Sequence, residues 1–213
     1  MLVEIFLGLI FFSIFATVIM TLVGTLWIDR LYRSSAELTF PEKISERSKF
    51  RRPILFCSFA VLNGIIFLST DLPEKFFLLA AIFLLALMTV TDFEQYMLFD
   101  AMTLPFALIG AARAWQMNFD LLNCAAAALI GGGVFFLLAL ATKGALGGGD
   151  VKLIAALGLW FGGEGLLNVV LAGTVAGGAA ALLLIAAGKK QRDSYFAYGP
   201  YFALTAIYFL LTS

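Results

Sequence analysis

Long runs of apolar residues dominate this chain and leave it few ways to fold. A run of about 20 apolar residues is long enough to cross the hydrocarbon core of a bilayer as a helix. The runs predict eight spans, over 3–27, 53–70, 75–91, 101–117, 122–142, 151–163, 166–187 and 196–212. We therefore expect an all-α fold, a polytopic membrane helix bundle of about eight transmembrane helices.

The composition supports a membrane protein. Of the 213 residues 62% are hydrophobic and 13% are charged, with a mean hydropathy of +0.99. A soluble domain of this size does not need so much apolar surface, whereas a bundle that faces lipid does. A membrane β-barrel is not expected, because the chain lacks a series of alternating ten-residue segments.

Lysine and arginine predict the orientation of the bundle. If the N-terminus is outside, all but two of the 14 basic residues lie inside or at the inner edge of the membrane, the exceptions being Lys75 and Arg113. This is the bias that cytoplasmic loops show. The orientation places Asp92, Asp100 and Asp150 on the cytoplasmic side.

We expect residues 1–213 to form a single membrane domain. The segment 28–52 is the only sizeable polar piece, and it is too short to build a core of its own. We interpret it as a short cytoplasmic loop. It contains no cysteine, so the sequence predicts no zinc site there.

Two aspartates lie at the edges of apolar runs, where a carboxylate is expensive and marks a candidate functional site. Asp92 follows the run that ends at Val90, and Asp150 follows a glycine-rich stretch. The chain has no histidine. Paired carboxylates can share a proton, one acting as general base on water and the other as general acid. The pair Asp92 and Asp150 therefore predicts the chemistry of an aspartic protease.

The glycines before Asp150 admit two interpretations. Gly147 and Gly149 would let another backbone approach closely, so a substrate strand could lie against this loop and present its peptide bond to the carboxylate. Alternatively the stretch is an ordinary turn in which Asp150 caps the next helix.

Other residues near these aspartates also have alternative roles. Asp100 is interpreted as the N-cap of the fourth span, with a catalytic role as the alternative. Lys152 either extends to the membrane interface or pairs with a carboxylate, and we expect a supporting role. The spacings Gly158-x-x-x-Gly162 and Gly173-x-x-x-Gly177 predict close helix packing.

Three motifs carry a resemblance to a known family. The segment Lys143 to Trp160, with its Gly-x-Gly-Asp, resembles the signature of type IV prepilin peptidases, which are GxGD membrane aspartic proteases related to archaeal preflagellin peptidases. The segment Thr91 to Pro105 is similar to the family's first aspartate segment. Tyr198-Gly199-Pro200 resembles its glycine-proline element.

The resemblance implies an aspartic endopeptidase of the bacterial inner membrane, with the active site facing the cytoplasm and the protease core over 75–213. It would cut a short basic leader after a glycine from prepilin or pseudopilin substrates of type IV pilus or type II secretion systems. Membrane lipid is the other expected partner, and no nucleic acid is expected. The implied catalytic residues are Asp92 and Asp150, and the implied supporting or substrate-binding residues are Gly147, Gly149, Lys152, Asp100, Gly199 and Pro200.

The chain departs from the family pattern in its first polar loop. Many bacterial members also methylate the new N-terminus with S-adenosylmethionine, and they carry two cysteine pairs in the first cytoplasmic loop. Residues 28–52 have none. We therefore expect no cofactor and no metal for proteolysis, with S-adenosylmethionine relevant only if methyltransferase activity is retained.

Two other classes of protein compete with a peptidase. A proton-coupled small-solute transporter would also use carboxylates at the membrane edge, but the chain has no convincing internal repeat and its acidic residues gather on one side. A non-catalytic assembly factor would not need both aspartates. For a peptidase, we expect Asp92, Glu94, Asp100 and Asp150 to form an acidic cytoplasmic mouth that attracts a basic leader.

Overall fold

The computed structural model describes residues 2–36, 38–69, 72–142, 146–188 and 196–212. Within these ranges every regular element is a helix. The chain divides into two compact units, Met1–Met97 and Leu98–Ser213. The prediction of an all-α helix bundle is confirmed.

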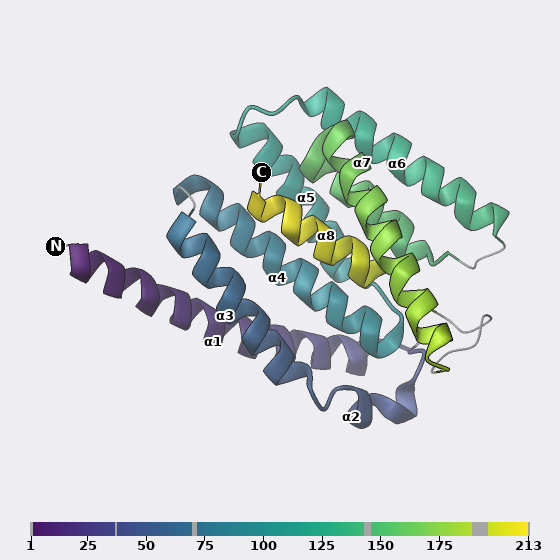
Figure 1. Ribbon diagram of the computed structural model, residues 1–213, viewed down its shortest axis with the longest axis horizontal. Helices are drawn as coiled ribbons and strands as arrows, with labels where there is room; N and C mark the ends of the chain where they lie inside the picture. Colours follow the sequence, from purple (N-terminus) through teal and green to yellow (C-terminus); the bar gives the residue numbers. More distant parts are fainter. Residues whose placement is uncertain (1, 37, 70–71, 143–145, 189–195, 213) are drawn as a thin grey trace. The chain divides into compact units, whose positions relative to one another are not determined.

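The first unit is built on three long helices (Figure 1). They are α1 (Leu2–Ser34), α3 (Arg51–Ser69) and α4 (Leu72–Gln95), and the short helices η1 (Pro41–Lys43) and α2 (Ile44–Arg47) lie between α1 and α3. Helix α3 packs against both α1 and α4. Large apolar side chains such as Phe59 and Leu85 are fully buried between these helices, whereas Phe11 on α1 is 65% exposed, as a residue in contact with lipid would be.

The second unit is organised around α7. It contains α5 (Asp100–Gln116), α6 (Leu121–Ala141), α7 (Gly148–Ala186) and α8 (Gly199–Thr212), and α7 packs against the other three. Gly162 interrupts α7 with φ 64° and ψ −169°, a backbone conformation that is essentially restricted to glycine. The two segments of α7 run in different directions (Figure 1). The predicted break between 151–163 and 166–187 is therefore confirmed at Gly162.

The glycine spacings serve helix packing, as expected, at three of their four positions. A Cβ atom on Gly158 would lie 2.4 Å from the backbone nitrogen of Ala128 on α6. Cβ atoms on Gly173 and Gly177 would lie 2.5 Å and 2.9 Å from aromatic ring atoms of residues 202 and 198. Gly162 has a different role, because it is the residue that breaks α7.

Five helices, α1, α3, α4, α6 and α7, are long and apolar enough to cross a membrane. Helices α5 and α8 are shorter, with 17 and 14 residues. The eight expected spans correspond to α1, α3, α4, α5, α6, the two segments of α7, and α8. The chain is a multi-pass membrane protein.

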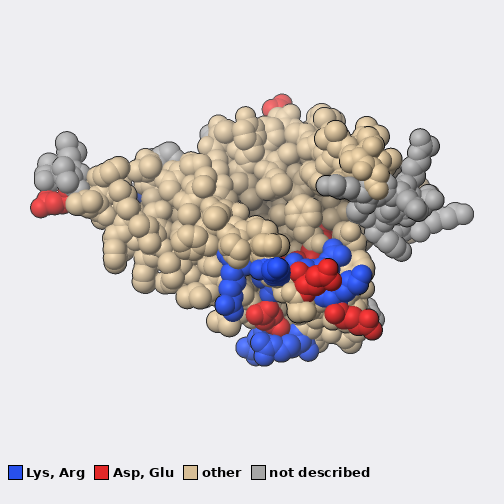
Figure 2. All heavy atoms as spheres, turned by 60° about the horizontal axis from the view of Figure 1, so that its bottom comes forward, with Lys and Arg blue, Asp and Glu red and all other residues tan. Residues whose placement is uncertain are grey.

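The segment 28–52 contains more helix than expected of a loop, because α1 continues to Ser34 and α3 begins at Arg51. Charged side chains of both signs gather where η1 and α2 join α1 to α3 (Figure 2). The neighbouring apolar stretches of α1 and α3 carry few charges. Most described charges of the first unit thus lie at one end of it, with Glu4, Glu74 and Lys75 as exceptions in the first turns of α1 and α4.

Gly158→Ala should lower the thermal unfolding midpoint of the purified protein in detergent. The added methyl group would meet the backbone of α6, and overpacking of this kind typically costs about 1–3 kcal/mol. Gly133→Ala is the matched control, because a Cβ there meets no described atom within 4 Å and alanine favours the helix. Equal midpoints for the two variants would show that α6 and α7 are not in close backbone contact.

Candidate active site

Asp92 lies in the last turn of α4, in the first unit. Only 6% of its surface is exposed, and Thr91, Glu94 and Gln95 beside it are also buried. The Asp92 carbonyl accepts a hydrogen bond of 2.9 Å from the backbone N–H of Tyr96. Tyr96 has φ 54°, a left-handed conformation typical of a residue that ends a helix. The last turn of α4 therefore places the Asp92 carboxyl at the edge of the apolar span.

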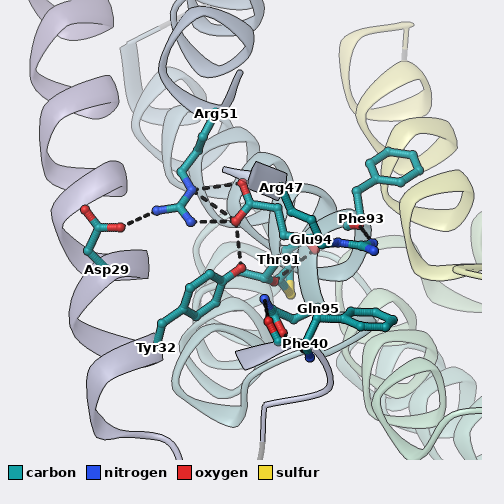
Figure 3. A network of polar contacts seen from close by, with 10 residues as sticks. Asp29, Tyr32, Phe40, Arg47, Arg51, Thr91, Phe93, Glu94 and Gln95 are labelled. Carbon is teal, nitrogen blue, oxygen red and sulfur yellow. Dashed lines mark hydrogen bonds and ion pairs between the residues drawn. The ribbon is translucent and has the colours of Figure 1, made fainter. Parts of the chain in front are cut away.

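Glu94, two residues after Asp92, takes part in a buried ion pair with Arg51 (Figure 3). Arg51 Nε donates to both carboxylate oxygens of Glu94, at 2.9 Å and 3.1 Å, and Arg51 Nη2 donates to Oε2 at 2.5 Å. Arg51 Nη1 pairs with Asp29, and the Tyr32 hydroxyl donates to Glu94 Oε2 at 2.9 Å. The Arg51 and Glu94 side chains are 3% and 7% exposed. Bidentate geometry with additional hydrogen bonds is what a buried ion pair requires.

The segment around η1 and α2 also holds the end of α4. Gln95 Oε1 accepts a hydrogen bond of 2.8 Å from the Phe40 N–H, and Gln95 Nε2 donates to the Phe40 carbonyl at 3.4 Å. Arg47 Nη2 donates to the Phe93 carbonyl at 2.7 Å (Figure 3). The Arg47 guanidinium also lies over the rings of Phe40 and Tyr96, at 4.3 Å and 5.4 Å from their centroids. The Phe93 carbonyl, which lies in the last turn of α4, thus accepts a hydrogen bond from the Arg47 side chain.

Asp150 lies in the first turn of α7, in the second unit, and is half-buried. The N-cap of α7 is Gly147, and the Asp150 N–H donates to the Gly147 carbonyl at 3.1 Å. The interpretation of Asp150 as a capping residue is therefore wrong, because the helix begins before it. A Cβ on Gly147 would lie 3.5 Å from Asp150 Oδ2, so the carboxylate lies beside the Gly147 backbone.

Gly149 is needed for packing. A Cβ atom on Gly149 would lie 2.8 Å from the Cβ of Leu98. Only glycine lets the chain just before α5 lie against the first turn of α7. The substrate contact expected for Gly149 stays a prediction. Lys143, at the start of the same glycine-rich segment, lies outside the described residues.

Asp100 and Lys152 form an ion pair between α5 and α7. Lys152 Nζ donates to the two carboxylate oxygens of Asp100, at 2.6 Å and 2.8 Å. Of the two alternatives for Lys152, the structure shows the pairing with a carboxylate. The N-cap of α5 is Phe99, so the N-cap interpretation of Asp100 is wrong. Both side chains are more than half exposed, and an ion pair in such a position typically contributes little stability.

A groove of about 410 Å³ adjoins this ion pair. It opens between α5, α6 and α7 and is mainly apolar, with small side chains among its walls. Its lining residues include Thr103, Ala107, Ala128, Ala155, Ala156 and Leu159.

Gly199 and Pro200 begin α8 and are buried. The neighbouring residues Tyr198 and Phe202 contact Gly177 and Gly173 of α7, so this segment packs α8 against α7. The substrate-binding or supporting role expected of Gly199 and Pro200 stays a prediction.

Two of the four carboxylates expected to attract a basic leader have basic partners. Glu94 is buried and paired with Arg51, and Asp100 is paired with Lys152. The attraction of a basic leader stays a prediction.

The Arg51–Glu94 pair is not among the features that the sequence predicted. In the sequence, Arg51 is one of many basic residues of the polar segment. The available signal was the spacing of Asp29 and Tyr32, three residues apart at the end of an apolar helix and hence on one face of it.

Comparison with known proteins identifies the family of this helix bundle. Residues 78–182 match the model of the type IV leader peptidase family. This segment contains α5 and α6 together with most of α4 and α7, and therefore both candidate aspartates. The match confirms the resemblance to the type IV leader peptidase family that the motifs predicted.

Three relatives are named prepilin leader peptidase/N-methyltransferase. The protein of Pectobacterium carotovorum subsp. carotovorum is 32% identical over 130 residues, which cover 58% of this chain and 47% of the relative. That of Burkholderia pseudomallei strain 1026b is 34% identical over 54% of this chain and 40% of its own length. That of Legionella pneumophila is 29% identical over 63% of this chain and 49% of its own length. The chain spans about half the length of the curated relatives it matches. No solved structure matches significantly.

Gly149→Ala should loosen the first turn of α7, because the new methyl group would collide with Leu98. We expect faster trypsin cleavage after the exposed Lys152 in detergent, measured by mass spectrometry. Gly148→Ala is the control, since a Cβ there meets no described atom within 4 Å. The packing role of Gly149 would be refuted by equal cleavage rates in the two variants.

Proposed function

We propose that this chain is a membrane aspartic endopeptidase that removes a short basic leader from prepilin or pseudopilin proteins. Cleavage would follow a glycine, at the cytoplasmic face of a bacterial inner membrane, in a type IV pilus or type II secretion system. The supporting observation is that the segment matching the leader peptidase family, 78–182, contains both Asp92 and Asp150. No observation favours the transporter alternative.

The proposed chemistry needs two carboxyl groups in different protonation states. The ionised carboxylate takes a proton from water, and the resulting hydroxide attacks the carbonyl carbon of the scissile peptide. The protonated carboxyl donates its proton toward the carbonyl oxygen, and the tetrahedral intermediate then collapses as the leaving amine gains a proton. Asp92 and Asp150 are the proposed pair, within a protease core over 75–213.

The other residues of the site take supporting roles in this proposal. Gly147 is exposed beside the Asp150 carboxylate, so it can meet a substrate backbone without a side chain in the way. The Asp100–Lys152 pair links α5 to the turn that carries Asp150. Gly199 and Pro200 would support the site through the packing of α8.

The proposal does not extend to methyl transfer. The relatives' names include N-methyltransferase, but the chain spans about half of their length. Residues 28–52 also lack the cysteine pairs of the bifunctional members. Membranes that contain this chain should therefore shorten a prepilin without S-adenosylmethionine, and mass spectrometry of the product should place the cut after a glycine.

Asp92→Asn and Asp150→Asn should each reduce prepilin cleavage at least about a hundredfold, because each variant removes one of the two proton-transfer groups. The protein should remain inserted and abundant by immunoblot. Asp120→Asn is the control: Asp120 caps α6 through its side chain, and asparagine caps equally well. Substantial cleavage by either aspartate variant would remove that residue from the proposed mechanism.

Cleavage should be unaffected by a metal chelator. The chain has no histidine, its polar segment has no cysteine, and the described residues hold no group of three or more histidine, cysteine, aspartate or glutamate side chains that could bind a metal. The measurement is the prepilin cleavage rate with and without the chelator. Inhibition that added zinc reverses would contradict the prediction.

A further inference from the structure

We propose that Arg51 is a positioning residue, which holds Glu94 and so fixes the rotation of the last turn of α4, where Asp92 lies. This inference rests on the proposed function, because it assigns Arg51 a part in presenting a proposed catalytic carboxyl. Neither the family match nor the relatives' names assign a role to Arg51, and it lies outside the matched segment 78–182.

The geometry of α4 relates the direction of Asp92 to that of Glu94. Successive residues of an α-helix are about 100° apart around its axis, so Glu94 and Asp92 lie about 160° apart. Glu94 is bound to residues of α1 and α3. Asp92 must therefore project from the opposite side of α4, and any rotation of this turn that swings Glu94 away from Arg51 also redirects Asp92.

The contacts of Glu94 restrict such a rotation. Arg51 binds both carboxylate oxygens through Nε and Nη2, which is the planar bidentate arrangement that arginine alone provides. Arg51 is itself held through Nη1 by Asp29, while Tyr32 donates to Glu94. Asp29 and Tyr32 lie on one face of α1, three residues apart. Two helices thus hold one carboxylate of the third (Figure 3).

The residues next to Glu94 are held as well. The Phe93 carbonyl accepts from Arg47, and the Gln95 side chain exchanges hydrogen bonds with the Phe40 backbone. The ends of helices tend to fray because their last carbonyls have no partner in the helix. Here three successive residues, 93 to 95, bind groups from 40–51. This segment therefore acts as a clamp on the last turn of α4.

The kinetic test uses Arg51→Gln, Arg51→Lys and the control Arg52→Gln, which removes an exposed arginine one position away. Displacement of a reacting group by about 1 Å can reduce a rate about a hundredfold. We expect Arg51→Gln to lower kcat for prepilin cleavage roughly tenfold to a hundredfold, with KM within about twofold. Arg51→Lys should have an intermediate kcat, because lysine keeps the positive charge but cannot bind the carboxylate through two planar N–H groups. Arg52→Gln should match the parent chain.

A spin label separates positioning from loss of fold. Phe93 is 47% exposed, so Phe93→Cys on a Cys57→Ser, Cys124→Ser background would carry a label on the last turn of α4. The label should become more mobile in Arg51→Gln and remain unchanged in Arg52→Gln. Tyr32→Phe removes only the hydroxyl that donates to Glu94, and it should give a smaller change in the same direction. This variant provides a second test in case the Arg51 variant misfolds.

Each outcome of these measurements either supports or overturns the proposal. Increased label mobility together with a lower kcat supports the proposal. An unchanged label, an unchanged kcat or an effect on KM alone in Arg51→Gln would overturn it. A parent chain that cleaves no prepilin would refute the proposed function instead, and label mobility would still decide whether Arg51 holds the last turn of α4.

Discussion

Hydrocarbon offers no partners to polar groups, and this constraint shapes the whole chain. Backbone N–H and C=O groups must bind each other within the bilayer, so the spans are helices. Charged side chains in a span are costly unless they are paired or lie near its end. Asp92 and Asp150 satisfy the constraint in the same way, because one lies in the last turn of α4 and the other in the first turn of α7.

The same constraint explains why the Arg51–Glu94 pair matters for geometry more than for stability. Two charges removed from water lose much of their solvation, so such a pair is often no more stabilising than apolar residues of similar size. Loss of one partner is different, because it leaves an unpaired buried charge and costs about 3–5 kcal/mol. The pair therefore penalises any arrangement of α1, α3 and α4 in which Arg51 and Glu94 do not meet.

The sequence predicts the features that depend on length and local chemistry. Apolar run lengths predicted the helices and a break between 151–163 and 166–187, and the spacing Gly158-x-x-x-Gly162 predicted close helix packing. The N-cap interpretation of Asp100 and the capping alternative for Asp150 are both wrong, because a cap depends on which residue leaves helical angles: Phe99 and Gly147 do so, not Asp100 and Asp150. The spacing of Asp29 and Tyr32 indicates a polar face of α1 but does not identify the Arg51–Glu94 pair, since its partners lie 43 residues apart on different helices and each alone resembles an ordinary charge at a membrane edge.

The two carboxyl groups are held by different kinds of interaction, and this difference determines which changes each can tolerate. The turn that carries Asp92 is fixed by charges and hydrogen bonds, so it should tolerate changes in side-chain volume better than changes in charge. The turn that carries Asp150 is fixed by close packing, because Gly149 must leave room for Leu98. There, one methyl group is enough to displace the backbone. The neighbouring Asp100–Lys152 pair is exposed, so its loss should cost little stability. The changes that damage the two turns should therefore differ: loss of charge or of hydrogen-bonding groups for the turn of Asp92, and added volume for the turn of Asp150.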